Sequence, residues 1–362
     1  HRKLHAPVER NRNKRRIVMS QTVGAKVDLR KKLAQNKMFS IGLILFGMFL
    51  LATFTNPYFF TEYNLQSVVR DLAFIGIVAI GQSCLLLLGE LDLSVGKIAS
   101  LSGVLGGMMM VNYGLNPWFS FVTCILLGAL FGAINGTIIT KLKLNAMVVT
   151  IGMQGLYGGI NLVLTKGKAI TKVPESIYVL GTGTFMKVPV PFLFTLAVLI
   201  IVVFLIKKTK FGRYVYAIGN SREAATILGV KTDSVRVKVY TLMGALSALA
   251  GMLMMARLGA SQPSIGDNWP MNSIAASVIG GLALTGGVGN PAGALIGAAI
   301  IMLIQNMIVL YGVNVYWQTA VSGIVVVLAI SIDSITVILG ERRLRKAHIA
   351  KRNAGLAAAH KE

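Results

Sequence analysis

The chain has 362 residues, of which 54% are hydrophobic and only 14% are charged, and its formal net charge is +23. A soluble domain carries roughly a quarter charged residues, so this composition excludes an ordinary soluble protein and predicts an all-α polytopic membrane protein. The basic residues gather in 2–37, 207–238 and 342–361, a distribution that orients membrane helices and contacts anionic membrane lipid, and that does not form a nucleic-acid groove.

Ten apolar stretches are long enough to predict membrane spans, because a span needs roughly 20 apolar residues. They are 39–55, 71–89, 93–111, 117–140, 146–165, 190–206, 239–258, 272–288, 291–310 and 316–339. Glycines and polar residues within 71–111 and 272–291 predict that some of these helices are broken or re-entrant.

The distribution of Lys and Arg predicts the orientation. With the N-terminus in the cytoplasm, 29 of the 36 Lys and Arg residues lie in inner segments and six in outer ones, as the positive-inside rule requires. Both termini are therefore expected in the cytoplasm. Residues 1–38 and 341–362 are basic tails around a membrane domain over 39–340, and 207–238 is a cytoplasmic loop. Met19 is a candidate natural start, which would make 1–18 an upstream extension.

Four outer connections are richer in aromatic residues and prolines, or longer, than simple turns. They are 56–70, 166–189, 258–271 and 311–316. Such segments fit interfacial anchoring by aromatic side chains, and they fit equally a landing surface for an extracytoplasmic partner.

The densest polar cluster between predicted spans is GELDLSVG at 89–96. Carboxylates in lipid are expensive, so Glu90 and Asp92 are expected in a boundary turn, in a protein-lined cavity or in ion pairs. Asp92 suits a helix cap, in which its carboxylate accepts from the backbone N–H of Ser94 or of the next residue. This structural cap is the preferred interpretation and direct substrate contact is the alternative. Lys97 is close enough in sequence to pair with either acid.

Amide side chains within the spans form a second group of candidates. Amides at mid-span tie helices together, and they also suit a path for a sugar, whose hydroxyls need donors and acceptors. Helix–helix bonding is the preferred interpretation for each one, and lining of a transport path is the alternative. The residues are Asn135, Gln154, Asn161, Gln305, Asn306 and Gln318.

The longest polar interruption is 207–238, with eight Lys or Arg against two acids. Ser221 can cap a short helix over Glu223–Leu228, with Glu223 in the first turn, where a carboxylate suits the helix dipole. Gly229 can end this helix. A short helix exposed on the cytoplasmic side is a docking surface; the alternative is an ordinary loop that satisfies only the positive-inside rule.

No arrangement typical of catalysis or metal binding occurs in the predicted spans. The four histidines lie in the tails, and Cys84 and Cys124 lie in separate apolar stretches, which predicts a protein that is not an enzyme and has no metal site. The glycine-rich segment 285–291 lacks the Lys-Ser/Thr pair and the βαβ context of a nucleotide-binding loop. Tight packing is the preferred interpretation of that segment.

Several motifs occur together along the membrane region. They are GELDLSVG at 89–96, KTKFGRY at 208–214 with YAIGN at 216–220, ARLGASQP at 256–263 and IAASVIGG at 274–281. As a set, they resemble the inner-membrane permease of ABC sugar importers of the ribose, xylose and galactose type. Two departures bear on the substrate rather than the family: Glu90 replaces a usually neutral residue, and NWPMN at 268–272 replaces a more acidic sequence.

The pattern Glu223-Ala224-Ala225-x-x-x-Gly229 resembles the EAA loop of the same permeases, the helix that seats in a groove of the ATPase subunit. The resemblance implies that Gly219, Glu223, Ala224, Ala225 and Gly229 couple transport to that subunit. It also implies a second permease subunit, identical or closely related, and an extracytoplasmic sugar-binding protein. ATP and Mg would be bound by the ATPase, so this chain would need no cofactor.

The implied function is import of a monosaccharide or similar small polyol across a bacterial inner membrane. A related ABC permease for branched-chain amino acids is one alternative. A secondary transporter driven by an ion gradient is another, although it would need acid or histidine relays at mid-membrane, which are scarce here. An integral membrane enzyme is disfavoured because catalytic groups are missing.

Overall fold

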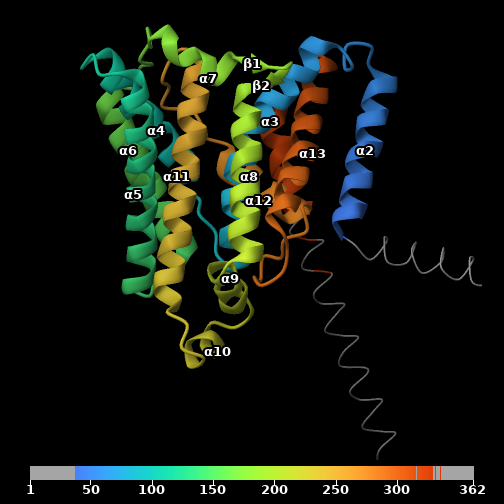
Figure 1. Ribbon diagram of the computed structural model, residues 1–362. Helices are drawn as coiled ribbons and strands as arrows, with labels where there is room; N and C mark the ends of the chain where they lie inside the picture. The colour runs from blue at the N-terminus through green and yellow to red at the C-terminus, as the bar shows by residue number, and fades with distance from the viewer. Residues whose placement is uncertain (1–36, 315, 329–330, 332–334, 336–362) are drawn as a thin grey trace, which may run out of the picture.

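The computed structural model describes residues 37–314, 316–328, 331 and 335. Within this part of the chain the fold is a helical bundle, and its only strands are the short antiparallel pair β1 (Thr184–Phe185) and β2 (Val188–Pro189) (Figure 1). Seven helices are long and apolar enough to cross a membrane, which agrees with the predicted all-α polytopic class. They are α2 (Lys37–Thr55), α3 (Glu62–Leu87), α5 (Pro117–Lys141), α6 (Ala146–Thr165), α8 (Val190–Lys208), α11 (Thr232–Leu258) and α13 (Pro291–Leu310).

Shorter helices complete the bundle and its connections. They are α4 (Val95–Val111), η1 (Glu175–Ile177), α7 (Tyr178–Thr182), α9 (Lys210–Asn220), α10 (Arg222–Ile227), α12 (Trp269–Ile279) and a helix over Trp317–Leu328. The outer connection 166–189 is thus folded into η1, α7 and the β1–β2 hairpin. The hairpin and α7 lie at one end of the bundle, and α9 and α10 lie at the other (Figure 1).

The span expected over 272–288 is not one helix. α12 ends at Ile279, and turns follow as far as α13. The physical reason is backbone geometry, because Gly281 and Gly286 have φ values of +87° and +90°, which an α-helix cannot accommodate and glycine adopts readily. The break predicted in 272–291 is therefore confirmed. Within 71–111, the non-helical connection 88–94 coincides with the predicted boundary between the spans 71–89 and 93–111, and α3 and α4 are each continuous.

Two helices begin earlier than the apolar pattern indicated. α3 starts at Glu62, so residues 62–70 are helical and not part of an outer loop; Thr61 caps them by accepting from the backbone N–H of Asn64 at 3.4 Å. α11 starts at Thr232, so the end of the basic loop is already helical. Most of 1–38, all of 341–362 and the end of the predicted span 316–339 lie outside the described residues.

The core lies around α3 and α11, the two most buried of the seven long apolar helices. α5 packs closely on α11 because glycines recur every fourth residue on its contact face. A Cβ at Gly132 would lie 2.1 Å from the carbonyl oxygen of Tyr240, and a Cβ at Gly244 would lie 2.2 Å from that of Gly128. Small residues at this spacing let membrane helices approach closely. At the edge of the bundle α2 contacts α13, and most of its surface is exposed (Figure 1).

Candidate functional site

The helix α10 lies at the tip of the bundle, at the end opposite the β1–β2 hairpin (Figure 1). The Oγ of Ser221 accepts from the backbone N–H of Ala224 at 3.2 Å, which is the predicted cap. Gly229 follows the helix with a φ of +80°. The helix therefore spans Arg222–Ile227, one residue earlier than the predicted Glu223–Leu228.

The surface of α10 combines an acid with uncovered apolar side chains. Glu223 and Ala224 are exposed, whereas Ala225 is buried against the bundle. Ile227 and Leu228 are 85% and 81% exposed. Large apolar side chains left uncovered beyond the membrane-crossing helices mark a site for a protein partner. The sequence analysis did not identify these two residues; the signal was their position at the end of the short helix that contains Ala225, off its buried face.

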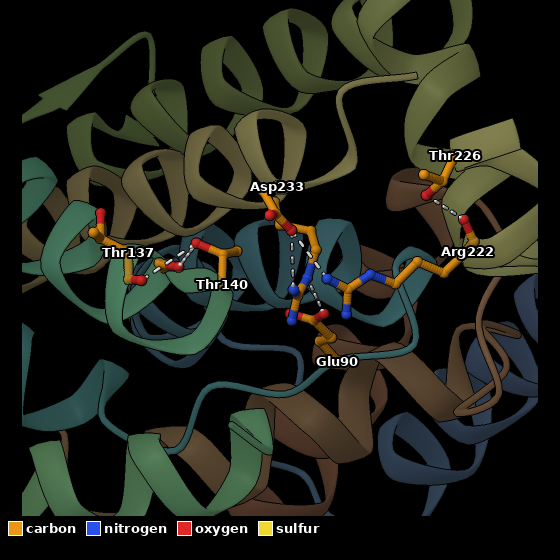
Figure 2. Close-up of polar contacts among 8 residues, drawn as sticks. Glu90, Thr137, Thr140, Arg222, Thr226 and Asp233 are labelled. Atoms are coloured by element: carbon orange, nitrogen blue, oxygen red, sulfur yellow. Dashed lines mark hydrogen bonds and ion pairs between the residues drawn. The ribbon is translucent and has the colours of Figure 1, made fainter. Parts of the chain in front are cut away.

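A chain of ion pairs links α10 to the connection between α3 and α4 (Figure 2). Nη2 of Arg222 lies 3.0 Å from Oδ1 of Asp233 on α11, and Nη1 of Arg236 lies 3.8 Å from the same oxygen. Nε of Arg236 donates to Oε1 of Glu90 at 2.5 Å. The side chains of Arg236 and Glu90 are only 4% and 13% exposed, so this last pair is shielded from water and salt. We refer to these four residues as the ion-pair chain.

Lys97 pairs with neither acid of the 89–96 cluster. Its Nζ lies 2.6 Å from Oδ1 of Asp267, in the segment before α12. The reason is the close approach of two backbones, since a Cβ at Gly96 would lie 2.0 Å from the carbonyl oxygen of Gly266. The start of α4 therefore faces the segment that leads into α12, and Glu90 is left to Arg236.

Asp92 forms the predicted hydrogen bond with Ser94, but it does not cap α4, whose N-cap is Ser94 with no side-chain cap bond. Its Oδ1 accepts from the backbone N–H of Ser94 at 2.8 Å and from the Oγ of Ser94 at 2.6 Å. Ser94 Oγ also accepts from Nδ2 of Asn135 on α5 (2.8 Å), whose Oδ1 accepts from the hydroxyl of Tyr157 on α6 (2.9 Å). Asp92, Ser94 and Asn135 are fully buried. This network joins α4, α5 and α6.

Two further amides lie on α6. Asn161 is buried and its Nδ2 donates to Oγ of Ser100 on α4, so it ties two helices together. Gln154 is half-buried and is not among the residues that line the cavity described below.

Gly219 lies in α9 and not on the surface of α10. A Cβ there would lie 1.9 Å from the carbonyl oxygen of Leu87 and 2.6 Å from the backbone nitrogen of Gly287. Nearby, the hydroxyl of Tyr216 donates to the carbonyl oxygen of Gly289 at 2.8 Å, and burial raises the pKa of this tyrosine above its ordinary value. α9 is thus packed on the end of α3 and on the turns that follow α12.

A cavity of about 710 Å³ is lined by residues of α3, α12 and α13 and of the segments next to them. Its lining residues on α3 and α13 include the N-terminal part of α3 and the C-terminal part of α13, which lie at the end of the bundle that carries the β1–β2 hairpin (Figure 1). Three of the amides for which path lining was the alternative interpretation line it: Gln305, Asn306 and Gln318. Asn306 and Asn64 exchange hydrogen bonds of 2.8 and 3.2 Å between their amides. Six amide side chains line the cavity in all: Asn64, Asn268, Asn272, Gln305, Asn306 and Gln318.

The charged groups that line this cavity are Asp71 and Asp267, and each has a basic partner. Asp71 pairs with Arg257 of α11, and Asp267 pairs with Lys97 of α4. The cavity wall therefore combines amides and hydroxyls with apolar side chains, and both of its carboxylates are paired. Among the described residues, no group of three or more His, Cys, Asp and Glu is arranged to hold a metal ion.

Comparison with known proteins places this arrangement in a family. Residues 64–330 match the family described as "Branched-chain amino acid transport system / permease component". The chain is 38% identical to the ribose import permease protein RbsC of Bacillus subtilis over 291 residues, covering 80% of this chain and 90% of that protein. It is 32% identical to the RbsC of Escherichia coli K12 over 283 residues, 77% of this chain and 88% of that protein.

A third relative is named for a different transported molecule. The autoinducer 2 import system permease protein LsrC of Photorhabdus luminescens is 34% identical over 307 residues, covering 83% of this chain and 91% of that protein. No solved structure matches the chain significantly.

Proposed function

The chain belongs to the family of ABC importer permeases, and on this premise we propose that it is the permease subunit of an ATP-driven importer for a monosaccharide or similar small polyol. The relatives are named for import of ribose and autoinducer 2, and the seven long apolar helices fit a bacterial inner membrane. The chain forms a transport path and hydrolyses nothing itself. Its partner ATPase binds ATP and Mg.

The observation that carries the coupling proposal is the exposed helix α10. Ile227, its last residue, and Leu228, which follows it, are exposed, as is Glu223 in its first turn. An apolar surface with a negative charge at the helix N-terminus fits a groove of a second subunit, in the manner of a helix in a hydrophobic groove. The ATPase therefore docks on α10, which includes Glu223, Ala224 and Ala225. Gly229 follows the end of this helix.

The ion-pair chain supplies a route from this docking site to the membrane. A displacement of α10 moves Arg222, and the partner of Arg222 is Asp233 at the start of α11. The guanidinium of Arg236 then bridges Asp233 and Glu90. Because Glu90 lies in the break between α3 and α4, the chain joins α10 to the region where those helices can change their relative positions.

Three further features complete the proposed assembly. Two permease subunits, identical or closely related, form the importer, and an extracytoplasmic sugar-binding protein delivers the solute at the β1–β2 end. Both termini lie in the cytoplasm, on the side of α10, since most of the Lys and Arg residues belong to that side. The complete bundle has ten apolar segments, of which some are broken.

Purification of this chain in a gentle detergent tests the proposal, with identification of the proteins that come with it and an assay of ATP hydrolysis. We expect an ATPase to co-purify and to drive sugar uptake in proteoliposomes. A chain that purifies alone and transports on an ion gradient would identify a secondary transporter. ATP-driven uptake of leucine and not of sugars would identify an amino acid permease.

A further inference from the structure

The cavity lined by α3, α12 and α13 has the dimensions of a solute site. Its volume of about 710 Å³ lies within the roughly 300–1,000 Å³ of typical small-molecule pockets. It extends from Tyr58 and Thr61, before α3, to Phe74 and Ile75, which lie about halfway along that helix. The N-terminal end of the short helix α12 also faces it, through Trp269. A solute that entered from the β1–β2 end would therefore reach the middle of the bundle.

One buried amide in the wall lacks a hydrogen-bond partner. Asn272 is only 3% exposed, and its Oδ1 has no partner in the structure. Buried polar side-chain atoms are nearly always paired, so this acceptor favours completion by a donor from outside the chain. Gln305 of α13 also lines the cavity, and its Nε2 donates to Oγ of Ser322 at 3.2 Å.

The wall offers a zwitterionic solute no unpaired charged side chain. The usual charged partners of an amino acid are a cation for its carboxylate and an anion for its ammonium group. Asp71 and Asp267 are the charged side chains among the lining residues, and both are engaged, by Arg257 and Lys97. Breaking either pair would leave a partly buried charge without its partner, which is unfavourable. The polar groups left to bind a solute in this cavity are amides and hydroxyls, and both can form hydrogen bonds with the hydroxyl groups of a neutral solute.

We propose that this cavity is a weak binding subsite for a neutral polyhydroxy solute, in which the amides of Asn272 and Gln305 bond to its hydroxyls. The permease then discriminates against zwitterions by itself, in addition to any selection by a binding protein. This inference rests on the proposed function, which requires a solute to pass this point. Binding is weak because a transported solute must leave its site again.

Cysteine alkylation in the full chain tests the subsite. Ser67 lines the cavity on α3, so Ser67→Cys places a reactive thiol in the wall, and Thr184→Cys places one on the exposed hairpin as a control. The native Cys84 and Cys124 are buried, and the unmutated chain gives their background rate. The rate of maleimide labelling is measured with D-ribose, D-xylose, D-galactose or L-leucine present.

A subsite with a dissociation constant of ~1 mM predicts that ~10 mM of a bound sugar slows labelling at Ser67→Cys about tenfold. L-Leucine leaves the rate unchanged, and no solute affects Thr184→Cys. Asn272→Ala and Gln305→Ala each raise the dissociation constant about fivefold, the effect of one hydrogen bond, so that ~10 mM sugar slows labelling only about threefold. Gln154→Ala, an amide outside the cavity, does not raise it. If Asn272→Ala fails to fold, the labelling rates of Gln305→Ala are sufficient to test the subsite.

Equal protection by leucine, or protection by none of the three sugars, overturns the subsite. Protection that persists unchanged in Gln305→Ala and Asn272→Ala overturns the assignment of these amides. Failure of the proposed function is recognised separately, as absence of ATP-driven sugar uptake when the same chain is assembled with its ATPase.

Discussion

Arg236 of α11 donates through Nε to Oε1 of Glu90, at 2.5 Å, where α3 and α4 are interrupted. Both side chains are nearly buried. A carboxylate at position 90 is tolerated because a guanidinium from a distant helix neutralises it. From the sequence alone, Glu90 was expected in a boundary turn, in a protein-lined cavity or in an ion pair. Lys97 was the nearest candidate for the ion-pair partner.

Glu90→Leu is expected to lower the free energy of unfolding by about 3–5 kcal/mol, because it leaves the buried guanidinium of Arg236 without its main partner. The double variant Glu90→Leu/Arg236→Leu is expected to lose less, since neither charge remains buried. Thermal unfolding of both single variants and the double variant in detergent measures the coupling. Strictly additive losses would contradict the pairing.

Glu223→Lys is expected to uncouple ATP hydrolysis from uptake while the protein stays folded in the membrane. The substitution places a positive charge in the first turn of α10, where the helix dipole disfavours it, and on the proposed docking surface. Uptake and ATPase activity of the reconstituted complex measure the effect. Glu175→Lys, at an exposed first-turn acid of η1 at the other end of the bundle, is the matched control. Normal ATP-coupled uptake by Glu223→Lys would contradict the proposal that the ATPase docks on α10.

Ile227→Ser and Leu228→Ser are each expected to weaken binding of the ATPase by about tenfold or more. Complete burial of one such side chain in an interface stabilises by about 1.5–3 kcal/mol, and tenfold in affinity corresponds to about 1.4 kcal/mol. Titration of the ATPase against the permease in nanodiscs gives the dissociation constants. Val179→Ser alters a side chain that is 51% exposed on α7, at the opposite end, and should leave affinity unchanged. Unaltered affinity in both α10 variants would place the interface elsewhere.

Asp92→Ala is expected to reduce expression and to lower the free energy of unfolding by about 1–3 kcal/mol, because the buried N–H and hydroxyl of Ser94 lose their acceptor. Asp92→Asn retains one carbonyl acceptor and should lose less. Melting temperature and yield in the membrane report these effects. A changed sugar preference at normal yield would instead indicate that Asp92 contacts the substrate.

Gly219→Val is expected to push α9 away from the end of α3 and to cost about 1–3 kcal/mol, as overpacking does. The added atoms would overlap the carbonyl of Leu87 and the backbone of Gly287. Gly155→Val on α6 is the control, since no atom lies within 4 Å of a Cβ built there. Equal stability of the two variants would show that α9 is not held at this contact.

Much of the local structure could be predicted because it depends on neighbours in sequence. The cap of α10 by Ser221, its end before Gly229 and the hydrogen bond from Ser94 to Asp92 each involve residues a few positions apart. The boundaries of α3 and α11 were misplaced, because polar residues at 62–70 and 232–238 continue helices beyond the apolar stretch that hydropathy detects.

By itself, the sequence determined that this chain is a helical membrane protein with a short capped helix in its basic loop, because hydropathy, charge and capping are local properties. Only the tertiary structure decided which side chains meet. Glu90 meets Arg236 across 146 positions, and Lys97 meets Asp267 across 170. The cavity likewise gathers Asn64, Asn272 and Gln305 from three helices. Such contacts depend on how close the helices approach, which glycines such as Gly96 and Gly132 set, and no local pattern specifies that packing.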